Sequence, residues 1–321
     1  MKPTLPLPLF ILTTLPLTLT PPTNAACTDA ADGFASLNGG TTGGAAGDTV
    51  TITTQAELAQ YAGAEEPYII KIPGRIEIDP RGTEIKVSSD KTIIGAGGEG
   101  EIFGGGFFLE GVRNVIIRNL RVGNTYVEDD PDGKTQDWDG VQMDTASNVW
   151  IDHCIFEKGG DGLIDSRKDT TYLTVSNTIL RDHNKVFGIG WTDNVSAEVT
   201  IHHNHFQNVN QRNPSTDNAL HAHLYNNYLE NVNSYGHYAR GGTAMKMENV
   251  FFQSTNNPIT KDDTASLDAS GNVYENCTGT IAENGGEVFD PREFYEYTVD
   301  AVEDVPAIVT AGAGPRAEVC E

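Results

Sequence analysis

The amino-acid sequence predicts an all-β protein folded as a single-stranded parallel β-helix. From residue 68 onward, short runs of β-branched residues alternate with Gly, Asn and Asp, and no later segment shows a long helical period. Many short strands of this kind indicate an all-β architecture. In addition, a six-residue unit recurs along the chain, and repeats of this kind are typical of solenoids and propellers.

The repeated unit reads aliphatic, any, Asn or His, any, any, aliphatic or aromatic. Its copies start at residues 117, 151, 175, 201, 224 and 247 and read IRNLRV, IDHCIF, VSNTIL, IHHNHF, LYNNYL and MENVFF. A propeller blade needs about 40–45 residues, which is more than these intervals allow. The spacing instead suits one coil of a β-helix with about three short strands per coil.

The third position of the unit predicts a stacked ladder of polar side chains at one bend of the solenoid. It is filled by Asn119, His153, Asn177, His203, Asn226 and Asn249. Side chains that stack in successive coils can bond to each other and to the neighbouring backbone. This structural role accounts for the two histidines better than catalysis does.

The ends of the β-helix are expected to differ from its repeated centre. Residues 53–63 read TTQAELAQYAG and predict a short helix that begins at Thr54. The segment from about residue 285 contains aromatic and acidic residues but no repeat. We expect this segment to pack along the solenoid.

Residues 1–25 predict a secretory signal peptide. A basic Lys2 precedes a short, proline-broken apolar run, and small residues follow near Ala25. This pattern is typical of signal peptides, and the run is too short for a membrane span. We therefore expect a secreted, extracellular protein whose residues 26–321 form one β-helix domain.

Four cysteines remain after the signal peptide, and an even number in an oxidising compartment favours two disulfides. Three pairings are open among Cys27, Cys154, Cys277 and Cys320. Asn194 and Asn276 begin N-glycosylation motifs, which apply only if the host is eukaryotic.

The net charge of −24 at pH 7 argues against nucleic acid and anionic membranes as partners. Binding of an anionic polymer would need a local device, such as bound cations or clustered Lys and Arg. No sequence feature indicates an oligomer, so a monomer is expected.

Carboxylates gather around the longest interval between repeat units. That interval contains the polar insertion GNTYVEDDPDGKTQDWDG at residues 123–140. Asp137 and Asp139 form an i, i+2 pair on one face of an extended chain, and Asp161 and Asp165 form an i, i+4 pair one coil later. The four carboxylates are expected to converge, and oxygen donors without His or Cys suit Ca²⁺.

Two other interpretations of these acids stay open. They could be scattered surface charges, or two of them could be the acid and base of a glycosidase. The insertion also carries four acids that we expect to be solvated loop charges, namely Glu128, Asp129, Asp130 and Asp132.

Three basic residues lie close to repeat units on the following coils, so they could share one face with the carboxylates. They are Lys185, Arg212 and Arg240. Cations beside a carboxylate–metal cluster suit a polymer of sugar acids, since Lys and Arg pair with carboxylates.

The stretch from NVIIRNLRV through NVWIDHCIF and VNQRNP to HLYNNYLENV resembles the pectate lyase/pectin lyase superfamily of right-handed parallel β-helices. The similarity is greatest to its calcium-dependent pectate lyases and covers about residues 30–260. NVWIDH, RNP and HLYNN at these spacings are specific together, although none of them is specific alone.

This resemblance implies β-elimination on polygalacturonate or pectin of the plant cell wall, with Ca²⁺ as cofactor. It assigns proton abstraction to Arg212 and substrate binding to Lys185. The metal ligands it implies are Asp137, Asp139, Asp161 and Asp165.

The chain departs from the family pattern RxPxxR because Asp217 occupies the place of the second arginine. Arg240 or His221 is expected to take over part of that arginine's contact with substrate. The alternatives are a pectin lyase acting on methyl-esterified polymer, a polygalacturonase, and a pectin-binding solenoid without activity.

Overall fold

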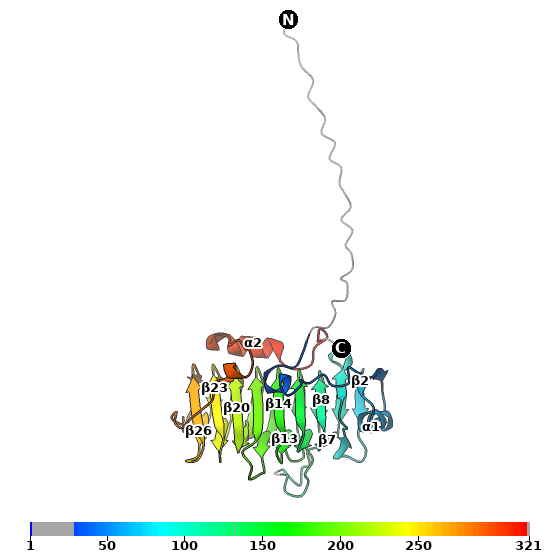
Figure 1. The fold of residues 1–321 in the computed structure, drawn as a ribbon, viewed down its shortest axis with the longest axis horizontal. Coiled ribbons are helices and arrows are strands. Elements are labelled where there is room, and N and C mark those ends of the chain that lie inside the picture. Colours follow the sequence, from blue (N-terminus) through cyan, green and yellow to red (C-terminus); the bar gives the residue numbers. More distant parts are fainter. Residues whose placement is uncertain (2–28, 132, 320–321) are drawn as a thin grey trace.

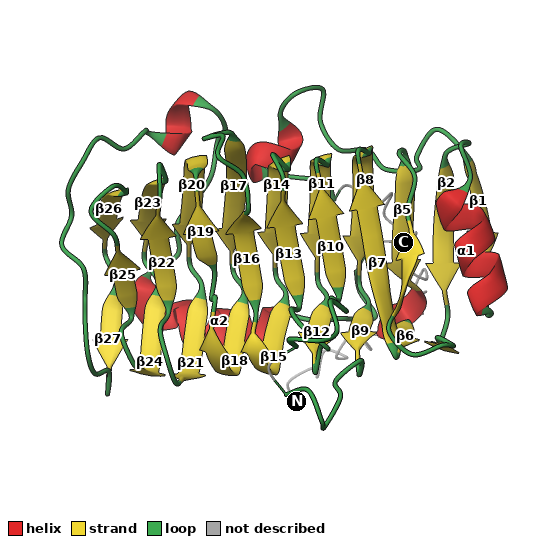
Figure 2. Ribbon diagram, turned by 90° about the horizontal axis from the view of Figure 1, so that it is seen from below, coloured by secondary structure: helices red, strands yellow, loops and turns green. Residues whose placement is uncertain are grey.

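The structure is a computed structural model that describes residues 1, 29–131 and 133–319. It is a right-handed parallel β-helix in which three parallel sheets stack along one axis (Figures 1 and 2), which confirms the predicted fold class. The signal peptide predicted for residues 1–25 lies almost entirely outside the described residues. Among the described helices, none is long and apolar enough to cross a membrane.

Each coil contributes one strand to each sheet. Sheet A contains β1 (Asp48–Thr51), β2 (Tyr68–Ile72), β5 (Lys91–Gly95), β8 (Arg113–Arg118), β11 (Ser147–Asp152), β14 (Thr171–Ser176), β17 (Ala197–His202), β20 (Ala219–Tyr225), β23 (Ala244–Glu248) and β26 (Ser266–Ser270). Sheet B contains β3 (Arg75–Glu77), β6 (Glu101–Phe103), β9 (Arg121–Gly123), β12 (Ile155–Glu157), β15 (Ile179–Lys185), β18 (His205–Gln211), β21 (Tyr228–Val232), β24 (Phe251–Thr255) and β27 (Val273–Glu275). Sheet C contains β4 (Thr83–Lys86), β7 (Gly105–Glu110), β10 (Val141–Asp144), β13 (Ile164–Arg167), β16 (Phe187–Gly190), β19 (Ser215–Asp217), β22 (His237–Arg240) and β25 (Ile259–Lys261).

The core consists of columns of apolar side chains that run along the axis. The register of sheet A stacks one inward position of seven successive strands, all fully buried: Ile93, Ile117, Ile151, Val175, Ile201, Leu224 and Met247. Six of these residues are the first residue of a copy of the repeated unit, and Ile93 lies one coil before the first copy. This is why the repeat can be recognised in the sequence.

The polar ladder lies one residue later than the sequence predicts. Asn204 and Asn227 are fully buried, and the Nδ2 atom of each donates to a backbone oxygen on the preceding coil, that of Val175 at 2.9 Å and that of Ile201 at 2.8 Å. The backbone N–H of Asn204 in turn donates to Asn227 Oδ1 at 3.0 Å. The predicted third positions instead adopt positive φ, which turns their side chains out of the stack.

The outward third positions hold the C-terminal segment against the solenoid. Asn226 and Asn249 donate to the backbone oxygen of Asp300 at 3.1 and 2.8 Å, and His203 Nε2 lies 2.9 Å from its carboxylate. After η3 (Pro291–Glu293) and η4 (Val302–Asp304), α2 (Val305–Gly312) packs over β21 and β24 through Val305 and Val309 (Figure 1).

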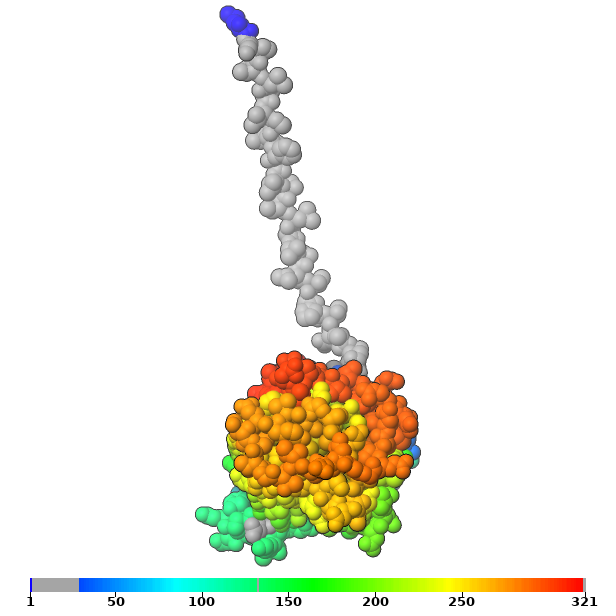
Figure 3. Space-filling view, turned by 90° about the vertical axis from the view of Figure 1, so that its left-hand side faces the viewer, coloured from blue at the N-terminus to red at the C-terminus, as the bar shows by residue number. Residues whose placement is uncertain are grey.

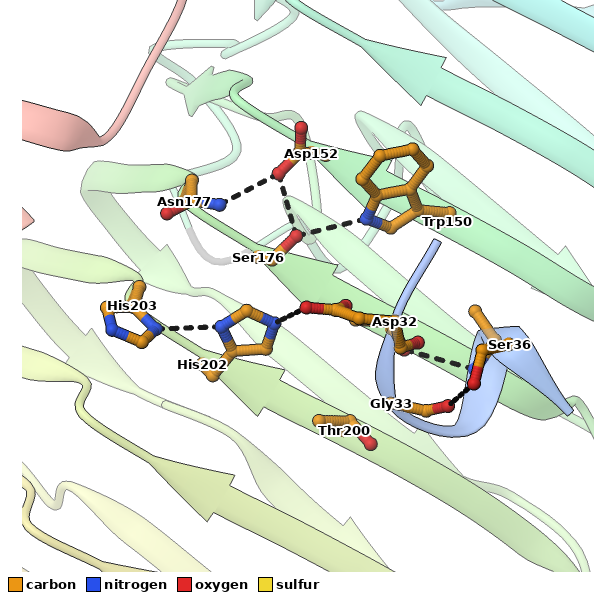
Figure 4. A network of polar contacts seen from close by, with 12 residues as sticks. Asp32, Gly33, Ser36, Trp150, Asp152, Ser176, Asn177, Thr200, His202 and His203 are labelled. Atoms are coloured by element: carbon orange, nitrogen blue, oxygen red, sulfur yellow. Dashed lines mark hydrogen bonds and ion pairs between the residues drawn. The ribbon is translucent and has the colours of Figure 1, made fainter. Parts of the chain in front are cut away.

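The N-terminal segment lies on the outer face of sheet A. After η1 (Gly33–Ser36), it leads to β1 and then to α1 (Gln55–Gly63), which a Thr54 capping box begins as the sequence predicts. The remaining short helix is η2 (Ala96–Gly98). Figure 4 shows Asp32 bound to His202, whose Nδ1 lies 2.8 Å from Nδ1 of His203.

The expectation of two disulfides is wrong for two of the four cysteines. Cys154 is a buried free thiol inside the stack, and Cys277 is a half-buried free thiol near the last coil. Cys27 and Cys320 lie outside the described residues.

The buried ladder should contribute strongly to stability. Asn204→Ala would leave Val175 O and the N–H of Thr178 without partners, so the free energy of unfolding should fall by about 2–4 kcal/mol. Urea unfolding measures this change. Asn233→Ala, at an exposed asparagine, is the matched control and should change it by less than about 0.5 kcal/mol. Equal effects of both substitutions would contradict the role of the ladder.

Candidate active site

Two outward-facing columns on sheet C organise the site. One runs through Gln142, Asp165, Gly188, Ser215 and Tyr238 on successive strands. The second, two residues further along each strand, carries Asp144, Arg167, Gly190, Asp217 and Arg240. Polar and charged side chains from four of these five coils therefore share one face, and the coil between them contributes only glycines.

Three of the four predicted metal ligands come together just before two strands of this sheet. Asp137 and Asp139 lie in the loop before β10, and Asp161 lies in the turn before β13. One carboxylate oxygen of each lies within 4.8 Å of the others. The sequence predicts an extended strand for Asp137 and Asp139, but both lie in a loop. There Asp137 is exposed and Asp139 is fully buried.

Asp165 lies next to this group, on β13. Its Oδ1 is buried and has no hydrogen-bond partner among the described residues. A Cβ atom placed on Gly162 would be 2.8 Å from Asp139 Oδ1 and 3.1 Å from Asp165 Oδ1, so the two oxygens border the same small space. An orphaned carboxylate oxygen beside that of Asp139, next to a group of three carboxylates with no His or Cys, fits a hard divalent cation such as Ca²⁺.

Glu84 on β4 belongs to the same cluster, although the sequence gives no sign of it. Its Oε1 accepts a hydrogen bond from Asp139 N at 3.2 Å. Gly106 on β7 pairs with Glu84 and lies on the coil between Glu84 and Asp139. Because Gly106 has no side chain, this position does not separate Glu84 from Asp139. Burial, together with neighbouring carboxylates, raises the pKa of Asp139 to about 7 and of Glu84 to about 8. A bound cation would offset this repulsion.

Asp130 organises the loop that carries Asp137. We expected a solvated charge, but its carboxylate is buried and accepts hydrogen bonds from Thr135 Oγ1 at 2.6 Å and from the N–H groups of residues 134–136. These bonds, that of Thr135 above all, lower the pKa of Asp130 to about 2. The loop projects from the body of the solenoid (Figure 3), so internal bonds of this kind are what hold it in place.

The predicted basic residues Lys185 and Arg212 lie on adjacent coils at the corner between sheets B and C. Lys185 ends β15 and is the register partner of Gln211, the neighbour of Arg212. Lys185 Nζ forms an ion pair with Asp161, which joins it to the carboxylate cluster. Among the described residues, no carboxylate lies within ion-pair distance of the Arg212 guanidinium, which contacts the ring of Trp191 at 5.2 Å instead.

A buried histidine supports the turn that carries Arg212. His237 on β22 is fully buried, and its Nδ1 donates to the backbone oxygen of Asn213. The backbone oxygen of Arg212 accepts from Phe187 N at 2.6 Å. The guanidinium therefore extends from a turn that is tied to the coils on both sides.

Asp217 pairs with Arg240 on the next coil. Arg240 Nε lies 3.7 Å from Asp217 Oδ2, and the two are register partners. One pair further back in the same column, Arg167 Nε lies 2.9 Å from Asp144 Oδ1. Arg240, one coil after position 217, lines one groove with Trp191, Arg212, Asp217 and Tyr235.

The expectation that His221 contacts substrate is wrong. His221 is on β20 in sheet A, where it bonds to Glu198 and packs against Phe34, Phe289 and Phe294. His153 and His203 also lie at the turn between sheets A and B, not between B and C where the carboxylates gather. Sequence reasoning missed Glu84, Arg167 and Trp191. The alternation of inward and outward residues in β13 is the signal that could have identified Arg167.

A parallel β-helix with a cluster of carboxylates close to lysine and arginine on one outer corner has the architecture of an enzyme that acts on an acidic polysaccharide. A family model described as pectate lyase matches residues 4–308. The chain belongs to the pectate lyase family, and it is an enzyme of that class.

Similar proteins include two curated relatives and one solved structure. A pectate trisaccharide-lyase of Thermotoga maritima is 36% identical over 95% of this chain and 94% of its own. A pectate trisaccharide-lyase of Bacillus licheniformis is 32% identical over 88% and 85%. The crystal structure of a pectate lyase from Bacillus sp. N165 in complex with trigalacturonate has a TM-score of 0.78 and 27% identity, and covers 90% of this chain and 100% of that one.

Acid should destabilise the protein through His237. Burial lowers the pKa of His237 to about 3, whereas a histidine in the unfolded chain has a pKa of about 6.5. The unfolded state therefore binds a proton first, so the stabilisation is complete above about pH 6.5 and is lost as the pH falls toward 3. Thermal unfolding between pH 4 and 8 measures this slope. His237→Gln, which can donate to the same oxygen but does not titrate, should show a shallower slope, and an unchanged slope would contradict the assignment.

Proposed function

We propose that this pectate lyase cleaves polygalacturonate by a Ca²⁺-dependent β-elimination. The observation that carries the proposal is the cluster of Asp137, Asp139 and Asp161, with the orphaned Asp165 oxygen, beside Lys185 and Arg212. The four aspartates would hold the cation. When bound, Ca²⁺ would supply positive charge to the uronate carboxylate of the substrate and so make the C5 proton more acidic.

In the elimination, a base removes the C5 proton, the electron pair of that C–H bond forms the C4–C5 double bond, and the C4–O bond breaks. The departing sugar oxygen takes up a proton. Arg212 is the proposed base because its guanidinium lies in the groove and has no carboxylate partner in the described part of the chain. A neutral arginine is needed for this step, and since a free guanidinium has a pKa above about 12, turnover is expected to favour alkaline pH.

Lys185 and Arg240 would bind and orient substrate carboxylates on either side of Arg212. Lys185 pairs with Asp161 in the cluster, and Arg240 is held by Asp217 at the other end of the groove. Two arginines in one groove, with Lys185 on the adjacent coil, favour free uronates over methyl esters, since esterification removes the charge that they bind. Pectate is therefore the proposed substrate in preference to methyl-esterified pectin.

The relatives' names identify a product to look for. Two curated relatives are named pectate trisaccharide-lyases, so an unsaturated trisaccharide is the expected main product. A secreted, monomeric enzyme is proposed as well, since the N-terminal 25 residues have the composition of a signal peptide.

Substrate and metal can be tested in one experiment. The protein is incubated with polygalacturonate or with methylated pectin, each with Ca²⁺ or EDTA, and the ultraviolet absorbance of the unsaturated product is followed. Product from polygalacturonate only with Ca²⁺ is expected. Product from methylated pectin in EDTA would indicate a pectin lyase, saturated ends would indicate a polygalacturonase, and binding without cleavage would indicate a non-catalytic solenoid.

Asp139→Asn should separate metal binding from folding. It removes one of several crowded carboxylates, so in EDTA the unfolding temperature should rise relative to the wild type. The further stabilisation by added Ca²⁺ should shrink, because a ligand stabilises the folded state according to its affinity. Asp129→Asn, at an exposed acid of the same loop, should leave both values unchanged. An unaltered Ca²⁺ effect in Asp139→Asn would contradict its place among the ligands.

Arg212→Ala should lower turnover of polygalacturonate by about 10²- to 10⁴-fold, which is the usual contribution of a proton-transfer group. Stabilisation by Ca²⁺ should persist, because Arg212 is not among the proposed ligands. The kcat of both proteins is measured with saturating Ca²⁺. Substantial remaining turnover would exclude Arg212 as the base.

A further inference from the structure

The groove contains one large apolar side chain that the proposed reaction does not use. Trp191 follows β16, and 48% of its surface is exposed. Its φ of 54° is uncommon for so bulky a residue. It lines the groove with Arg212, Asp217, Tyr235 and Arg240.

The sequence of β16 makes room for the indole. Phe187 and Ile189 point into the core, so Gly188 and Gly190 face outward and leave that part of sheet C without side chains. A Cβ atom on Gly188 would lie 2.1 Å from Cη2 of Trp191, which shows that the ring folds back over this glycine. The same Cβ would be 3.0 Å from Asp165 Oδ1, so the ring lies beside the carboxylate cluster.

Aromatic rings accompany both groove arginines. The guanidinium carbon of Arg212 is 5.2 Å from the centre of the Trp191 ring, and that of Arg240 is 5.5 Å from the centre of the Tyr238 ring. Tyr238 in turn packs edge-on against Tyr235, with ring centres 5.4 Å apart. Contacts of this kind orient a guanidinium without neutralising its charge.

A galacturonate residue has two chemically different sides. Its carboxylate suits the cations, and one face of its ring presents C–H groups, which suit an aromatic surface because the ring face is electron-rich. The groove offers both surfaces side by side.

We propose that Trp191 is a further specificity-determining residue of this reaction, which rests on the function proposed above. Its exposed surface stacks on the galacturonosyl ring next to the cleaved bond, and its contact with Arg212 positions the guanidinium. Trp191 thus acts on the sugar directly and on the proton transfer through Arg212.

The test compares Trp191→Ala with Trp191→Phe on polygalacturonate at saturating Ca²⁺. The alanine variant should raise KM by about 3- to 10-fold, the usual range for one aromatic contact, and should also lower kcat several-fold. The phenylalanine variant should restore both values to within about twofold, since it retains a ring. Leu220→Ala, at an exposed apolar residue on sheet A, is the control and should match the wild type. An unchanged KM in Trp191→Ala would overturn the stacking role, and an unchanged kcat would overturn the positioning role.

A second variant tests the contact between the Trp191 indole and Gly188 by changing the glycine on β16. Gly188→Ala puts a methyl group where the indole lies, so it should raise KM as Trp191→Ala does. If it acts through the indole, the double variant should have the KM of Trp191→Ala alone. Multiplicative effects of the two substitutions would overturn the position assigned to the ring.

Tryptophan fluorescence separates this inference from the reaction itself. Trp150 is buried, Trp138 is half-buried in the loop before β10, and Trp191 is exposed. Binding of saturated trigalacturonate should change the emission of the wild type, and the part of that change that Trp191→Phe loses comes from Trp191. This measurement needs no turnover. A wild type that binds trigalacturonate but releases no unsaturated product from polygalacturonate would refute the proposed function and leave the stacking role standing, whereas equal signals from the two proteins would refute the stacking role alone.

Discussion

The structure depends on the in-register hydrogen bonding of parallel coils. Each strand of one coil pairs with the equivalent strand of the next, so a residue's place in its coil decides whether it joins the core or the surface. Apolar columns inside and the Asn204–Asn227 ladder at the corner follow from this constraint. The same constraint aligns the outward columns of sheet C, so residues more than 20 positions apart in sequence become neighbours at the site.

The architecture could be predicted from the sequence because its apolar positions recur with each coil. The polar ladder was misplaced by one residue because the strict inward–outward alternation of a strand breaks at a corner. There the third position of the unit takes positive φ, and the next residue, such as Asn204, points inward instead. A linear pattern does not show this change of direction.

The site was predictable in part. The resemblance identified acids and bases that the structure brings to one corner, with Asp137, Asp139 and Asp161 in one group and Lys185 paired to it. Glu84 was missed because it reaches Asp139 across Gly106, over 55 positions in sequence. His221 was misassigned because closeness in sequence to Arg212 says little once the chain passes from sheet C to sheet A. Trp191 has no counterpart in the repeat, and its position over Gly188 is visible only in three dimensions.

The two ends of the solenoid are covered, and this limits how far the stack can grow. At one end, α1 lies beside β2 and β4 (Figure 2), and its own residues Leu58 and Ala62 are buried. At the other end, the chain turns back so that Gly285 forms an antiparallel bridge with Leu267 on the last strand of sheet A. An uncovered end would offer rows of free N–H and C=O groups to a second molecule. The caps thus terminate a repeat that could otherwise continue from one molecule into the next as a fibre.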